Sequence, residues 1–131
     1  MKFRAPDGTG DVLPEQAALW RRLEEAARAC FESFGYEEIR TPIFEYAALF
    51  QKAGGETSDI VEKEMFTFAS QEGEGFALRP ELTPGVLRAL LEQNLFARKG
   101  FWKLWYAGAA FRKERPQKGR YRQFTQIGAE L

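Results

Sequence analysis

The first long pattern in the chain is that of an amphipathic helix over residues 14–34. Its apolar positions recur every three or four residues: Trp20, Leu23, Ala27, Phe31 and Phe34. Charged residues fall mostly between them, as on a helix with one buried face. Pro14 suits a first helical turn and Gly35 suits a helix end. We therefore predict a helix here that packs on the rest of the fold.

Residues 36–44 alternate in the manner of a β-strand. Ile39, Thr41 and Ile43 share one face, and polar residues or proline occupy the other. Pro42 has no N–H to donate to a neighbouring strand. We therefore expect the strand to lie at a sheet edge or to leave the sheet at Pro42. An edge strand of this kind could also be a subunit contact.

The middle of the chain predicts a short helix over 45–53, a loop over 54–57, and two strands joined by a turn over 71–75. These strands span 64–69 and 76–79. Thr83 and Pro84 are typical of an N-cap and a first helical position. The apolar stripe of this next helix should be Leu87, Leu90, Leu91 and Leu95.

Two long strands, over 101–114 and 121–131, close the sequence and flank a basic loop over 115–120. Strands joined by so short a loop are expected to form an antiparallel hairpin. Helices interleaved with antiparallel strands favour the α+β class, here an antiparallel sheet flanked by helices. With 131 residues and no visible linker, we predict one domain.

Composition excludes several kinds of site. The chain has 44% hydrophobic and 29% charged residues, which is ordinary for a soluble protein. It has one cysteine, Cys30, and no histidine, which excludes Cys/His zinc sites and catalysis by a Ser-His or Cys-His pair. Cys30 falls near the apolar stripe of the first helix, so we expect a small core residue. No apolar run is long enough to span a membrane, and the N-terminus is unlike a signal peptide. We expect a cytoplasmic protein with no metal site of its own.

The charges are unevenly distributed although the net charge is zero. Acidic residues predominate over 37–81, whereas 98–122 is strongly basic and has Glu114 as its one acidic residue. This asymmetry indicates that the later segment meets anions, such as the phosphates of a nucleotide or a nucleic acid. A solvated basic face remains the alternative.

The last strand divides into two faces by parity. Ile127, Ala129 and Leu131 point to one side and should pack on a helix. The opposite side carries an aromatic ring, an amide, a bare backbone position and a carboxylate: Phe124, Gln126, Gly128 and Glu130. Such a row could hold a small polar ligand, with the carboxylate gripping an ammonium group and the ring stacking on a planar base. A solvated strand face is the alternative.

Two further segments add to this row. Arg112 and Glu114 share a face of the preceding strand, and an arginine fork suits phosphate oxygens. Glu81 and Thr83 lie between a strand and a helix start, where side chains often face a ligand, although Thr83 could simply cap the helix. Formation of an aminoacyl-adenylate needs carboxylates that bind the amine, beside a cationic hairpin that binds the phosphate. No glycine-rich phosphate loop of the P-loop type is present.

The block over 111–126, FRKERPQKGRYRQFTQ, resembles motif 2 of the histidyl-tRNA synthetases, a class II family. Four other blocks agree in order and spacing: GTGDVLP (8–14), GYEEIRTPIFE (35–45), GETSDIVEKEMFTF (55–68) and ALRPELT (77–83). The block over 35–45 is similar to motif 1, the class II dimer element, whose proline would be Pro42. The resemblance spans nearly the whole chain.

The resemblance implies a role for each residue of the site. Arg112 would be the catalytic arginine that binds the α-phosphate of ATP. Glu114, Arg120 and Phe124 would contact the adenine side, the outer phosphates and the adenine ring, respectively. The histidine-binding set would be Glu81, Thr83, Gln126 and Glu130. The family uses ATP and Mg²⁺, forms histidyl-adenylate, esterifies tRNA and works as a homodimer through the motif 1 region.

The same resemblance marks departures. Motif 1 would lie at about 20–45 and motif 2 at about 101–131, with neither motif 3 nor an anticodon-binding domain, so we expect a fragment or a minimal engineered core. Leu82 stands where many members have glycine, and its bulk is expected to narrow the amino-acid pocket. The alternatives are a non-catalytic histidine sensor similar to the regulatory subunit of ATP phosphoribosyltransferase, and an inactive folding or dimerisation fragment.

Overall fold

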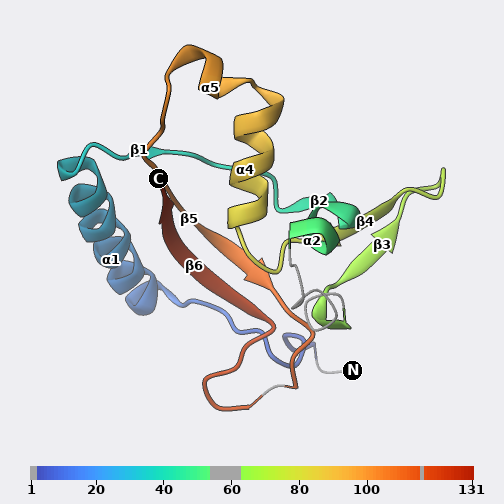
Figure 1. Ribbon diagram of the computed structural model, residues 1–131. Helices are drawn as coiled ribbons and strands as arrows, with labels where there is room; N and C mark the ends of the chain where they lie inside the picture. The colour runs from blue at the N-terminus through green and yellow to red at the C-terminus, as the bar shows by residue number, and fades with distance from the viewer. Residues whose placement is uncertain (1–2, 54–62, 116) are drawn as a thin grey trace.

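The computed structural model describes residues 3–53, 63–115 and 117–131, and consists of two small sheets with helices packed around them (Figure 1). In chain order the elements are α1 (Pro14–Ser33), β1 (Glu37–Glu38), β2 (Phe44–Tyr46), α2 (Ala47–Ala53), β3 (Thr67–Ala69), β4 (Gly75–Leu78), α4 (Thr83–Glu92), α5 (Leu95–Arg98), β5 (Leu104–Phe111) and β6 (Gln123–Glu130). One sheet has the order β1-β5-β6 and the other β2-β4-β3. The predicted α+β class is confirmed.

The antiparallel hairpin of β5 and β6 is the largest structural unit and lies at the centre of Figure 1. Its ladder runs from Leu104 opposite Glu130 to Phe111 opposite Gln123. Beyond it, a bridge between Gln117 and Arg120 closes the basic loop. The predicted hairpin is therefore correct, although both strands are shorter than expected at the loop end.

The segment over 36–44 does not form one strand, and that prediction was wrong. β1 is an edge strand that pairs in parallel with β5, whereas β2 belongs to the second sheet and pairs with β4. Pro42 lies between the two strands, where no ladder hydrogen bond is required of it. The prediction that the chain leaves the sheet at Pro42 is thus confirmed. The pairing of β1 with β5 is the one parallel pairing among the described strands.

Helix α4 covers one face of the hairpin and forms the main core with it. The buried members of this core are Leu82, Val86, Leu90, Leu104, Tyr106 and Ala110. The predicted stripe was partly wrong, because Leu87 and Leu91 are 46% and 71% exposed. The buried face instead follows positions 82, 86 and 90, each a little more than one turn from the last.

Helix α1 lies at the opposite face of the hairpin, and its bounds agree with the prediction. It meets the sheet mainly through Phe31, whose ring stacks on Trp105 with the ring centroids 5.5 Å apart. No residue of α1 is buried, and Cys30 is exposed. The expectation of a core cysteine was therefore wrong, because no residue of α1 belongs to either core.

The second sheet has a smaller core, formed by Phe50, Met65 and Ala77. The strand predicted over 64–69 is shorter than expected, since β3 begins at Thr67 and residues 63–64 are helical. The predicted loop over 54–57 lies outside the described residues. Among the helices that the structure describes, none combines the length and apolar character needed to cross a membrane.

Candidate active site

Alternation divides the hairpin into two faces as predicted, but the main core forms on the Phe124 face, and Leu131 of the face that was expected to pack on a helix is 83% exposed. Tyr106, Gly108 and Ala110 of β5 stand opposite Gly128, Gln126 and Phe124 of β6. Because side chains alternate along a strand, these residues share one face with Glu130, and Ile127 and Ala129 share the other. The first face is half-buried under the start of α4 and the segment before it, so the alternative of a solvated strand face was wrong.

A cluster of three polar side chains lies at one end of this face. The Thr83 hydroxyl donates to Oε1 of Glu130 at 2.6 Å, and the Tyr106 hydroxyl donates to the same oxygen at 3.0 Å. The two hydroxyl oxygens are 3.0 Å apart. Burial raises the pKa of the Tyr106 phenol above its ordinary value, so this side chain stays a proton donor. The arrangement concentrates donors on one carboxylate oxygen.

Thr83 is not the N-cap of α4, and that interpretation was wrong. The N-cap is Leu82, and no side chain caps this helix end. Thr83 is the first residue of the helix, where its hydroxyl reaches across to β5 and β6. The long-range hydrogen bonds therefore replace the local capping bond that the sequence pattern suggested.

The loop before α4 is tied to the centre of the same face. The backbone N–H of Leu82 donates to Oε1 of Gln126 at 3.1 Å, while Glu81 lies half-buried beside it in sequence. The Leu82 side chain is 2% exposed and packs in the main core. Its bulk therefore lies against the hairpin face that carries Tyr106 and Ala110.

Arginines gather at the other end of the face. The guanidinium of Arg112 lies over the Phe124 ring, 5.2 Å from its centroid, and its Nε donates to the carbonyl of Pro80 at 3.1 Å. Glu114 lies 3.9 Å from Arg112 and 3.8 Å from Arg120. These ion pairs are too long for direct hydrogen bonds, so both guanidinium groups keep donors for an anion.

Arg122 holds the N-terminal segment and the hairpin loop in place through its hydrogen bonds. Its backbone N–H donates to the carbonyl of Gly8 at 2.7 Å, and its guanidinium reaches the carbonyls of Glu114 and Asp7. A Cβ added at Gly8 would lie 2.8 Å from the Arg122 side chain. Arg122 thus fastens the N-terminal segment to the hairpin.

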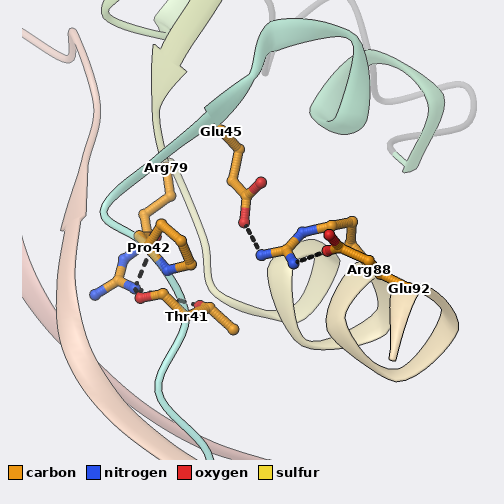
Figure 2. Close-up of polar contacts among 6 residues, drawn as sticks. All are labelled: Thr41, Pro42, Glu45, Arg79, Arg88 and Glu92. Atoms are coloured by element: carbon orange, nitrogen blue, oxygen red, sulfur yellow. Dashed lines mark hydrogen bonds and ion pairs between the residues drawn. The ribbon is translucent and has the colours of Figure 1, made fainter. Parts of the chain in front are cut away.

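The sequence reasoning missed two residues of this region, Tyr106 and Arg79. Tyr106 and Arg112 are an even number of residues apart in the strand predicted over 101–114, so alternation along that strand puts Tyr106 on the same face as Arg112. Arg79 is 6% exposed and donates to the carbonyls of Ala109 (2.7 Å), Thr41 (2.9 Å) and Pro42 (3.2 Å). Burial lowers its pKa, which the nearby Glu45 partly offsets. Figure 2 shows its guanidinium against Thr41 and Pro42.

The comparisons with known proteins agree with this fold. A family model described as histidyl-tRNA synthetase matches residues 8–131. This is a class of aminoacyl-tRNA synthetase, and the chain belongs to the histidyl-tRNA synthetase family. It is 52% identical to a histidine–tRNA ligase of Dictyoglomus turgidum over 131 residues, and 54% identical to one of Rubrobacter xylanophilus over 140 aligned residues.

The matches cover all of this chain but only 32% and 33% of those two relatives. The chain therefore spans about a third of the length of the curated relatives it matches. Among solved structures, the apo histidyl-tRNA synthetase of S. aureus is similar with a TM-score of 0.80 and 34% identity, over 98% of this chain and 28% of that one. A Bacillus halodurans protein, described as an ATP phosphoribosyltransferase regulatory subunit/histidyl-tRNA synthetase, is similar with a TM-score of 0.79 and 28% identity, over 100% and 32%.

Proposed function

We propose that this chain carries part of the histidine and ATP site of a histidine–tRNA ligase and takes part in forming histidyl-adenylate, which the whole protein transfers to tRNA. The observation that carries the proposal is the single hairpin face with a carboxylate cluster at one end and arginines at the other. The proposed unit is one partial catalytic domain, with motif 1 at about 20–45 and motif 2 at about 101–131. A cytoplasmic location is proposed with it.

Histidine would bind at the end formed by Glu81, Thr83, Gln126 and Glu130. Glu130 is fixed by hydroxyl donors on one oxygen, which leaves its other oxygen for the α-ammonium group. Glu81 adds a second carboxylate nearby, close enough that its charge helps to raise the pKa of Tyr106. Gln126 is held by the backbone of Leu82, so its position is set before ligand binds.

ATP would bind at the arginine end. In this proposal the Nη atoms of Arg112 take the α-phosphate while its Nε stays on the carbonyl of Pro80. Phe124 offers an aromatic surface for adenine, Glu114 lies on the adenine side, and the exposed Arg120 faces the outer phosphates. In-line attack by the histidine carboxylate on the α-phosphorus would form histidyl-adenylate and release pyrophosphate, and this step would need only alignment and charge stabilisation.

Mg²⁺ would arrive with the nucleotide. The described residues contain no group of three or more His, Cys, Asp or Glu side chains that could hold a metal. Mg²⁺ on a nucleotide usually keeps several waters and takes one or two carboxylates with the phosphates, so this donor set fits a nucleotide-borne ion. Glu114 is the carboxylate on that side, and the ion would neutralise phosphate charge when bound.

Histidine-dependent exchange of pyrophosphate into ATP tests the proposal. We expect exchange in the wild type, weak because the chain spans about a third of its relatives, and a loss of at least about 100-fold in Arg112→Ala. Arg98→Ala is the matched control on the exposed end of α5 and should change little. Exchange that is absent, or that survives the loss of Arg112, contradicts the proposal for this chain.

A histidine sensor without ligase activity is the second candidate, because the similar Bacillus halodurans structure carries both descriptions. Arg112, Glu114 and Arg120 favour the ligase, since a pure sensor has no need of a phosphate-binding arginine set. Histidine binding in calorimetry without any exchange would support the sensor. The absence of both histidine binding and exchange would support an inactive folding or dimerisation fragment.

A homodimer through the motif 1 region is proposed as well. Large apolar side chains are exposed on α1 and on β2 and the residues before it: Leu19, Leu23, Phe34, Ile43, Phe44 and Tyr46. Exposed apolar surface of this kind is typical of an interface. Sedimentation velocity would detect the dimer, and a monomer at all accessible concentrations would contradict it.

A further inference from the structure

Arg79 is a buried cation whose hydrogen bonds all go to neutral oxygen atoms. Its Nε and Nη1 donate to backbone carbonyls in two other segments, and Nη1 also lies 3.4 Å from the Thr41 hydroxyl. Arginine stays charged in proteins, so a full positive charge is held where only 6% of the residue is exposed. Within the described part of the chain, no carboxylate forms an ion pair with it.

The nearest acidic group is already committed to another arginine. Glu45 raises the Arg79 pKa through its charge, but its Oε1 lies 2.5 Å from Nη2 of Arg88. Arg88 also binds Glu92 at 2.6 Å (Figure 2). The Arg79 charge is therefore only partly offset, and such a group costs stability unless a ligand or partner compensates it.

The guanidinium lies over the middle of the hairpin face. A Cβ added at Gly108 would clash with Nη2 of Arg79, so only glycine leaves room for the guanidinium there. Gly108 stands opposite Gln126, between Tyr106 at the carboxylate end and Arg112 at the arginine end. Arg79 is thus the cationic side chain midway between the two halves of the proposed site.

The chemistry of adenylate formation places an anion at this midpoint. The amino-acid carboxylate attacks the α-phosphorus, and the bond to the leaving pyrophosphate breaks on the opposite side. The carboxylate must therefore lie between the site that holds the ammonium group and the site that holds the α-phosphate. We propose that Arg79 supplies the positive charge for the amino-acid carboxylate and so selects ligands that carry one. This inference rests on the proposed function, because it assumes the orientation of histidine given above.

Binding of histidine and of histidinol, which lacks the carboxylate, measures this role. Isothermal calorimetry gives the ratio of the two affinities in the wild type, Arg79→Lys and Arg79→Gln. Both variants keep side-chain donors for the carbonyls, but only lysine keeps the charge. We expect the preference for histidine to fall by about tenfold or more in Arg79→Gln and by much less in Arg79→Lys. Arg98→Gln is the control and should leave the ratio unchanged.

A role limited to folding would lower both affinities together and leave the ratio unchanged, which would overturn the inference. If circular dichroism shows that Arg79→Gln does not fold, Glu45→Gln tests the inference by a change in the opposite direction. It removes the carboxylate that partly offsets the Arg79 charge, so the ratio should rise, and an unchanged or lower ratio would overturn the inference. Wild-type protein that binds neither ligand refutes the proposed function and the inference with it, whereas binding with a ratio insensitive to Arg79 refutes the inference alone.

Discussion

Replacing Gly128 by alanine would drive a methyl group into the buried ring of Tyr106. The new Cβ would lie 2.5 Å from Oη, 2.7 Å from Cζ and 2.8 Å from Cε2 of that side chain. Ordinary carbon contacts are about 3.5–4.0 Å, so the ring must move by about 1 Å. Tyr106 is 4% exposed and its hydroxyl binds Glu130 at 3.0 Å, which leaves little freedom for such a shift.

The expected cost follows from these two contacts. Overpacking a close-packed site costs about 1–3 kcal/mol, and weakening a hydrogen bond to a charged group adds about 1 kcal/mol. We therefore expect Gly128→Ala to lower the free energy of unfolding by about 2–4 kcal/mol, measured by urea denaturation with tryptophan fluorescence. Gly10→Ala is the control, since among the described residues no atom beyond its two chain neighbours lies within 4 Å of the added Cβ, and it should change stability by less than about 0.5 kcal/mol.

A double-mutant cycle identifies the atom responsible. Tyr106→Phe removes Oη, the closest of the three contacts, but keeps the ring. Gly128→Ala should therefore cost about 0.5–1.5 kcal/mol less in the Tyr106→Phe background than in the wild type. The reasoning is refuted if Gly128→Ala costs no more than Gly10→Ala, or if its cost is the same in both backgrounds.

Three further predictions concern the same region. Thr83→Val removes the hydroxyl that donates to Glu130 at 2.6 Å and should lower the free energy of unfolding by about 1–3 kcal/mol in urea, whereas Thr83→Ser should lose much less. Arg88→Met leaves Glu45 unpaired and should cost about 2–4 kcal/mol in the same assay, and a loss below about 0.5 kcal/mol would contradict it. Burial raises the pKa of Tyr106 above 10.0, so the folded state keeps this proton longer than the unfolded state. The contribution of this retained proton to the free energy of unfolding is present below about pH 10 and is lost as the pH rises through the folded-state pKa of Tyr106. Tyr106→Phe should therefore flatten the alkaline fall in stability.

The hairpin was the part of the site that the sequence could predict. Its two strands are neighbours along the chain, and alternation then assigns Phe124, Gln126 and Glu130 to one face whatever the rest of the fold does. Arg112 follows from the same parity. Local pattern was sufficient here because the backbone pairing that sets these faces joins strands that are adjacent in the chain.

Contacts between distant segments could not be predicted in this way. Thr83 has the local pattern of a helix cap, and only the position of Glu130, 47 residues later, gives its hydroxyl a different partner. The position of Arg79 could not be predicted either, since the carbonyl groups that accept its hydrogen bonds lie 30 to 38 residues away in the chain. The prediction for Cys30 was wrong for the opposite reason: an amphipathic pattern predicts a buried stripe, but no residue of α1 is buried and Cys30 is exposed.

The long-range character of the carboxylate cluster also sets the order in which the site can form during synthesis and folding. The β5–β6 ladder closes a short loop and has low contact order, so it can form quickly once both strands exist. Thr83 and Tyr106 leave the ribosome before Glu130, the residue that both hydroxyls bind. Until β6 is made, these two donors have no shared acceptor, although α4 and the second sheet are already available to fold.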